Sequence, residues 1–191
     1  ILKLTEKEMR QMRGRQISMI FQDPMTSLNP VMPVGDQILE VIRNHHPELS
    51  KQDAKKQAGD MLEMVGIRPE RSVEYPHQFS GGMKQRVVIA MALACQPKLL
   101  IADEPTTAVD SIVQKQIMDV LVERSDKQNL SVIFASHDFA VISRVAHRCY
   151  VINNGGVVDS GRLEELYESS VDYTRQLVEA ARSIAVRGEG E

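Results

Sequence analysis

The sequence predicts an α/β protein built on a parallel sheet, and two observations lead to that prediction. Three segments of the 191-residue chain, 16–21, 98–103 and 131–136, are apolar runs of strand length. The segments 111–127 and 139–146 instead space their apolar residues as helices do. Strands that alternate with helices form parallel sheets with right-handed crossovers, so we expect one such sheet, in which 98–103 and 131–136 are buried strands.

The segment 34–78 interrupts this alternation, and we predict that it is an inserted all-helical lobe. A first helix is expected from Gly35 to about Asn44, after a loop at 26–33 that is rich in turn residues. Ser50 and Asp53 have the spacing of a capping box and should open a second helix. The predicted domains are a core remainder at 1–33, the helical lobe at 34–78, the main core at 79–165, and a C-terminal helix and tail at 166–191.

Near the end of the chain, Asn154-Gly155 stands between two strand-like segments, 149–153 and 156–159. Asn-Gly is the preferred pair for a two-residue β-turn, so these segments should form a hairpin. A stripe of apolar residues over 172–184 predicts a final helix.

Composition excludes some classes of partner. The net charge of −3, with four Tyr, four Phe and no Trp, offers neither the basic surface nor the stacking residues of a nucleic-acid binder. Apolar stretches such as 87–95 are too short to span a bilayer, so we expect no direct membrane insertion. The two cysteines lack metal spacing and fit a reducing cytoplasm. Because the chain begins with Ile, we expect it to start inside a longer protein.

Two adjacent carboxylates, Asp103 and Glu104, end the predicted strand 98–103. A carboxylate at the end of a buried strand is readily compensated by a bound cation, and its neighbour could polarise a water molecule. Alternatively, the acid at the strand end only caps the next helix. If Asp103 and Glu104 were the only evidence, this structural interpretation would be preferred. His137 strengthens the functional interpretation because it follows the next strand, at the sheet edge where α/β proteins bind ligands.

Ser80, Gly81 and Gly82 begin a predicted helix, where free backbone N–H groups can bind an anion. The alternative is a plain helix cap with a flexible entry. Gln22, at the end of the first strand, could be a loop residue or a switch that senses metal and water. None of the eleven glycines is followed by Lys, so the phosphate-binding sequence G-x-x-x-x-G-K-[ST] is absent.

The order of these motifs resembles the nucleotide-binding domain of ABC transporters over residues 1 to about 165. The resemblance implies a P-loop NTPase-like (ABC ATPase) fold with ATP and Mg²⁺ as cofactors. The resemblance also implies a role for each site residue. Gln22 would be the Q-loop glutamine near metal and water, Asp103 the Walker B metal ligand and Glu104 the general base. The signature that contacts nucleotide would be Ser80, Gly81, Gly82 and Met83, the D-loop aspartate would be Asp110, and the switch histidine would be His137.

The segments 22–30 and 79–83 look most like the subfamily that imports dipeptides, oligopeptides or nickel. The family works as a head-to-tail pair of ATPase subunits bound to membrane-embedded permease subunits at the cytoplasmic face of the membrane. The resemblance therefore implies the ATP-binding subunit of an importer, and without Walker A we expect the chain alone to be inactive. The alternatives are a non-catalytic partner subunit and a soluble ABC ATPase of repair or translation. We expect the helical lobe to dock on the permease, with Gln37, Arg43 and Asp53 as crosslinking positions.

Overall fold

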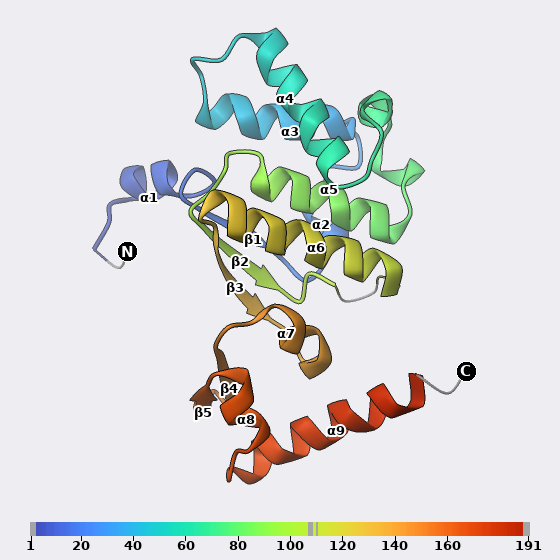
Figure 1. Cartoon of the computed structure of the whole chain (residues 1–191). Helices are drawn as coiled ribbons and strands as arrows, with labels where there is room; N and C mark the ends of the chain where they lie inside the picture. Colours follow the sequence, from blue (N-terminus) through green and yellow to red (C-terminus); the bar gives the residue numbers. More distant parts are fainter. Residues whose placement is uncertain (1–2, 107–108, 110, 189–191) are drawn as a thin grey trace. The chain divides into compact units, whose positions relative to one another are not determined.

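In a computed structural model of the chain, the described residues are 3–106, 109 and 111–188 (Figure 1). The chain divides into two compact units, Ile1–Ala135 and Ser136–Glu191. This division falls inside the predicted main core at 79–165, and the predicted domain boundaries stay predictions.

The first unit contains a parallel sheet in the order β1-β2-β3 (Figure 1). Its strands are β1 (Ile17–Ile20), β2 (Leu99–Asp103) and β3 (Ser131–Ala135). In the register, Ile20 lies opposite Ala102, and Asp103 lies opposite Ala135. The three predicted strands and their parallel pairing are therefore confirmed, and the carboxyl ends of β2 and β3 meet at the same edge of the sheet.

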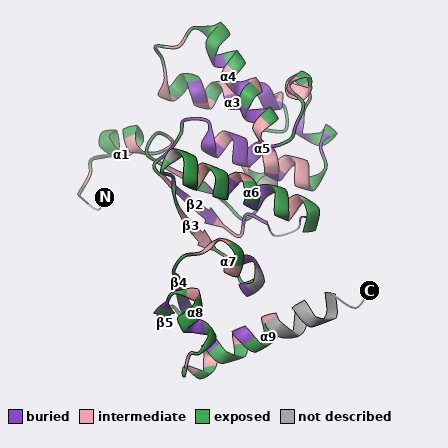
Figure 2. Cartoon of the chain, viewed as in Figure 1, coloured by how far each residue is buried: buried purple, intermediate pink, exposed green. Residues whose placement is uncertain are grey.

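One face of this sheet is buried under helices. Ile20, Leu100 and Ala102 are 0% exposed, α5 (Gly81–Leu93) packs against β1, and α6 (Ser111–Gln128) packs against β3 (Figure 2). Strand β2 alternates buried and half-buried residues, so the prediction that it is buried holds for one of its faces.

The prediction that β3 is a buried strand is wrong. None of its five residues is buried, and Ile133 is 55% exposed. Among the described strands β3 pairs with β2 alone, so it lies at the edge of the sheet, where an apolar sequence does not guarantee a covering layer.

The predicted helical lobe, whose residues 34–78 are all described, contains helices and no strand. It comprises α3 (Val34–His45), α4 (Lys51–Met64), η1 (Pro69–Val73) and η2 (Pro76–Gln78), and α3 packs against α4. Ser50 caps α4, since its Oγ accepts a hydrogen bond from the Asp53 backbone N–H at 3.1 Å. The reciprocal half of the predicted capping box is different, because the Asp53 carboxylate accepts from the Ser50 hydroxyl rather than from its backbone N–H.

Two of the short helices that were not predicted lie before the helical lobe. The expected loop at 26–33 begins inside α2 (Pro24–Ser27), which Pro24 can start because a proline needs no N–H partner in the first turn. Helix α1 (Glu6–Met12) begins with a complete capping box, in which Thr5 N–H donates to the Glu8 carboxylate at 2.8 Å and Thr5 Oγ1 accepts from Glu8 N–H.

The second unit contains α7 (Phe139–Val145), β4 (Cys149–Asn153), β5 (Gly156–Gly161), α8 (Leu163–Tyr167) and α9 (Asp172–Gly188). Strands β4 and β5 are antiparallel, which confirms the predicted hairpin. At its turn, Asn154 and Gly155 have φ values of 49° and 78°, the left-handed pair that a type I′ turn requires.

Cys149, Val151 and Leu166 form the core of this unit, and Tyr173 and Leu177 of α9 pack against it. Among the described residues, no helix combines the length and the apolar composition needed to cross a membrane.

Candidate nucleotide site

Gln22 and Glu104, 82 positions apart in the sequence, are joined by a hydrogen bond. Gln22 Nε2 donates to Glu104 Oε2 at 2.8 Å. Gln22 follows β1 by two residues and Glu104 follows β2 directly, so the parallel pairing of these strands places both side chains at the same sheet edge. Asp103 is the last residue of β2, so the structure groups three of the predicted site residues there.

The backbone at Glu104 has a conformation that residues other than glycine seldom adopt, with a φ of 45°. Such conformations persist where the surrounding structure holds them. Here the Glu104 N–H donates to the carbonyl of Ala135 at the end of β3 at 2.9 Å, and the Gln85 side chain donates to the carbonyl of Pro105 at 2.7 Å. The carboxylate is therefore placed by a backbone that contacts both β3 and α5.

The segment Ser80 to Met83 forms the start of α5, as predicted. Ser80 is the N-cap, and its Oγ accepts from the Met83 N–H at 3.3 Å. Ser80 and Gly81 are exposed, and a Cβ placed on Gly81 would meet no atom within 4 Å. N–H groups in the first turn of a helix have no partner within the helix, so this exposed start can accept an anion.

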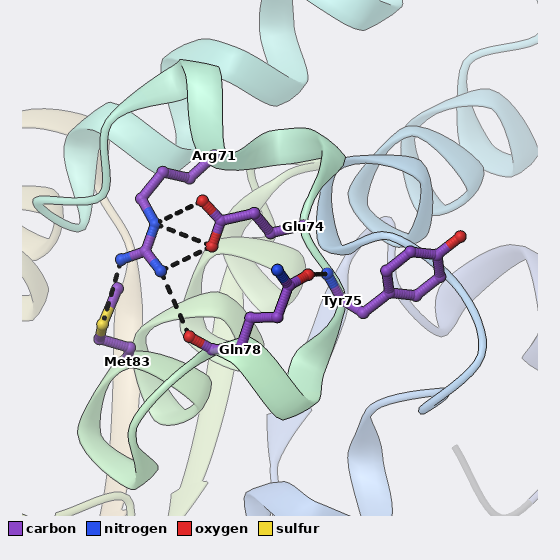
Figure 3. A network of polar contacts seen from close by, with 5 residues as sticks. All are labelled: Arg71, Glu74, Tyr75, Gln78 and Met83. Atoms are coloured by element: carbon purple, nitrogen blue, oxygen red, sulfur yellow. Dashed lines mark hydrogen bonds and ion pairs between the residues drawn. The ribbon is translucent and has the colours of Figure 1, made fainter.

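Arg71 of η1 holds the segment that leads into this helix (Figure 3). Its guanidinium donates to the Glu74 carboxylate at 2.6 to 3.0 Å, to the Gln78 carbonyl at 3.3 Å and to Met83 Sδ at 3.5 Å. It also lies over the Phe79 ring, with 4.5 Å from the guanidinium carbon to the ring centroid. The hydrogen bonds from Arg71 lower the pKa of Glu74, and those to Glu74 raise the pKa of Arg71, so both stay charged.

A second set of contacts ties the same segment to α3. The N–H of Val34, the first residue of α3, donates to the Glu74 carbonyl at 2.9 Å. Within the segment itself, the Tyr75 N–H donates to the Gln78 side-chain oxygen at 2.8 Å. Beside these bonds, Val31 is 80% exposed and Val73 69% exposed. Both are exposed apolar side chains within three residues in sequence of the Val34–Glu74 bond.

The donor set at the sheet edge fits a magnesium ion that also binds phosphate. No group of three or more His, Cys, Asp and Glu that could hold a metal occurs among the described residues. Magnesium bound with a nucleotide takes one or two protein carboxylates and completes its shell with phosphates and water. Asp103 at the end of β2 would supply such a carboxylate, so a complete protein cage is not needed.

The remaining predicted site residues are Asp110 and His137. Asp110 lies outside the described residues, as do Thr107 and Ala108. His137 is exposed and belongs to the second unit, two residues after the end of β3. The roles assigned to all these residues stay predictions.

Sequence reasoning missed Arg71 and Gln85. Arg71 has one local partner, Glu74 three residues later, but its contacts with Gln78, Phe79 and Met83 leave no local pattern in the sequence. For Gln85 a signal was available, because it is a polar residue in a helix whose other buried residues are all apolar.

Comparison with known proteins agrees with this geometry. A family model described as ABC transporter matches residues 2–107. The chain is 50% identical over 194 residues to the oligopeptide transport ATP-binding protein OppD of Bacillus subtilis (strain 168), covering 100% of this chain and 54% of that protein. It is 46% identical over 188 residues to the dipeptide transport ATP-binding protein DppD of Lactococcus lactis subsp. cremoris (strain MG1363), covering 96% of this chain and 54% of that protein.

The chain thus spans about half the length of the curated relatives it matches. Among solved structures, it is similar to the dimeric ATP-binding cassette MJ0796 in a post-hydrolysis state bound to ADP and Pi. The TM-score is 0.77 at 28% identity, over 84% of this chain and 68% of that one. This similarity confirms the predicted fold class. Since the family model matches more than half of the sequence and the fold agrees with a solved ATP-binding cassette, the chain belongs to the ABC transporter family.

Proposed function

We propose that this chain is the part of an ABC importer's ATP-binding subunit that carries the general base and the signature, and that the whole subunit couples ATP hydrolysis to uptake of peptides or a similar small solute. The observation that supports this proposal most directly is the hydrogen bond from Gln22 to Glu104, beside Asp103, at the end of β2. The names of the peptide-transport relatives support the class of solute.

In this proposal each residue at the sheet edge has a separate task. Asp103 holds Mg²⁺, which would offset the negative charge of the phosphates. Glu104 accepts a proton from the attacking water, and the Gln22 amide keeps its carboxylate oriented by donating to Oε2. For His137, which belongs to the second unit, the task stays the predicted one of holding the γ-phosphate or the water.

The signature segment would act on a second subunit. Ser80, Gly81 and Gly82 offer anion donors, but the chain contains no G-x-x-x-x-G-K-[ST] sequence to hold a nucleotide itself. We therefore propose a head-to-tail pair with a second ABC ATPase subunit, and no ATP turnover by this chain alone. If the protein were instead a non-catalytic partner subunit, Glu104→Gln would leave the turnover of the pair unchanged.

We propose that the permease subunits dock on the surface formed by Val31, Val73 and Tyr75, which would hold the protein at the cytoplasmic face of the membrane without inserting it. Large apolar side chains that are 80%, 69% and 39% exposed fit a protein partner. Gln37, chosen above for crosslinking, is unsuitable because it is 4% exposed and its amide donates to the carbonyls of Asn29 and Met32.

Crosslinking in membranes tests this surface. Cysteines at Val31 and Val73 should capture a permease subunit. A cysteine at Asp119, which is exposed on α6, is the control and should capture none. Equal crosslinking from all three positions would contradict the proposed surface.

The catalytic assignment is tested in the full-length gene product that contains this chain. Glu104→Gln keeps the acceptor for the Gln22 amide but removes the base, so ATP should still bind while hydrolysis falls by about 10²-fold or more. Asp103→Asn should weaken Mg²⁺-dependent nucleotide binding, because a hard cation loses an anionic ligand.

Asp119→Asn, an exposed carboxylate of α6, serves as the control and should change neither quantity. Unchanged hydrolysis in Glu104→Gln would show that Glu104 is a structural strand-end acid and that the assignment is wrong.

A further inference from the structure

Gln85 is a buried amide that connects the start of α5 to the turn after β2. It is 1% exposed, and its Nε2 donates to the carbonyl of Pro105 at 2.7 Å. Its Oε1 is buried and accepts no hydrogen bond from the residues that the structure describes. Burial of an amide with one unsatisfied atom is unfavourable, so the packing of this residue alone does not account for a glutamine here.

The bond that Gln85 makes reaches the residue next to Glu104. Because the Glu104 backbone has a φ of 45°, the peptide groups on either side must be held to keep that conformation. The Ala135 carbonyl holds the N–H of Glu104, and Gln85 holds the carbonyl of Pro105. Without the second bond, the turn could relax and move the Glu104 carboxylate away from Gln22.

The first turn of α5 also fits closely against α6, which begins a few residues after this turn. A Cβ on Gly82 would lie 3.2 Å from Val113 Cγ1 of α6. The turn after β2 contacts α6 as well, since the Gln114 amide donates to Thr106 Oγ1 at 3.3 Å. The bond from Gln85 is a polar contact between α5 and that turn.

We propose that Gln85 is a positioning residue for Glu104, through which the helix that carries the signature orients the general base of the same chain. The proposal rests on the proposed function. In a head-to-tail pair, the signature serves the nucleotide of the partner while Glu104 serves the chain's own site. Gln85 thus links the residues of this chain that act in two different ATP sites.

The test compares two glutamines, each of which donates its amide to a backbone carbonyl. Gln57 of α4 also donates its amide to a backbone carbonyl, that of Ala94 at the other end of α5, at 2.9 Å. Gln85→Met and Gln57→Met therefore each remove one amide-to-carbonyl bond, but only the first removes a bond beside Glu104. In the full-length gene product, Gln85→Met should lower kcat by about tenfold or more, with the KM for ATP changed by less than about twofold. Gln57→Met should leave both constants unchanged.

A second variant and a second measurement complete the test. Gln85→Asn keeps the amide but is one methylene shorter, so it should lower kcat in the same way. By hydrogen exchange and mass spectrometry, the peptide 99–106 should exchange faster in Gln85→Met than in Gln57→Met. Full kcat in either Gln85 variant, a raised KM with unchanged kcat, or equal exchange in the two Met variants would each overturn the proposal. If the unmodified gene product hydrolyses no ATP, the proposed function fails, and the exchange measurement still decides whether Gln85 holds the turn.

Discussion

Gly35 gives the prediction whose size follows most directly from the structure. It is buried in the first turn of α3, where that helix passes close to η1. A Cβ at this position would lie 2.5 Å from Ser72 Cβ and 2.8 Å from the Ser72 carbonyl oxygen. Because part of this contact is with backbone, rotation of a side chain cannot relieve it.

The substitution Gly35→Ala should therefore destabilise the protein. Overpacking a well-packed site costs about 1–3 kcal/mol, whereas alanine recovers at most about 1 kcal/mol of helix propensity. The bond from the Val34 N–H to the Glu74 carbonyl restrains η1 and hinders it from moving away. We expect a net loss of about 1–2 kcal/mol in the free energy of unfolding.

Gly59 is the matched control, because it lies inside α4 and a Cβ there would meet only Pro69 Cβ at an ordinary 3.6 Å. Gly59→Ala should stabilise the protein by about 0.5–1 kcal/mol through helix propensity. Urea unfolding followed by circular dichroism measures both. If Gly35→Ala proves as stable as the unmodified protein, or if both variants shift alike, the close approach of α3 and η1 is not as described.

Three further predictions concern the two units. Arg71→Ala should speed hydrogen exchange in the peptide 79–84, because the contacts to Gln78, Met83 and Phe79 are lost. Arg68→Ala is the control, since it removes an exposed arginine of the same region, and it should leave this exchange unchanged. Equal exchange in the two variants would contradict the role of Arg71. Burial raises the pKa of Cys95 to about 11, so at pH 8 only about one thiol in a thousand is ionised and iodoacetamide should label it only after unfolding, which mass spectrometry can follow. Hydrogen bonds from Ser169 and Thr174 lower the pKa of Asp159 in the folded protein. The stability that Asp159 contributes is therefore complete above its unfolded pKa of about 3.9 and is lost as the pH falls through the lower folded pKa. In acid unfolding, the stability of Asp159→Asn should depend less on pH in this range, and a profile identical to that of the unmodified protein would refute the prediction.

The sequence by itself determined the features that depend on neighbouring residues. Ser50 and Ser80 were recognisable as helix caps because a cap needs only a side chain and an N–H three residues later. Asn154-Gly155 determined the hairpin because few residue pairs adopt two left-handed conformations in succession. The order of the motifs also determined the family, since each motif is a short, contiguous run of residues.

The tertiary structure decided which distant residues meet. For Gln22 the sequence left a loop residue and a switch as alternatives, and only the pairing of β1 with β2 showed that its amide lies 2.8 Å from Glu104. Gln37 was chosen for crosslinking because it lies on a helix that was expected to face the permease. In the structure its side chain is buried, and its amide donates to the carbonyls of Asn29 and Met32.

The exposure of β3, and the roles of Arg71 and Gln85, likewise followed from the tertiary structure. An apolar strand sequence shows what a strand can bury, but its actual burial depends on the layer that covers it. The partners of Gln85 and Arg71 lie on other elements, and no local periodicity records which elements pack together. Hydrogen bonds and close contacts between distant segments form only when the chain has folded, so their partners could not be identified from local sequence patterns.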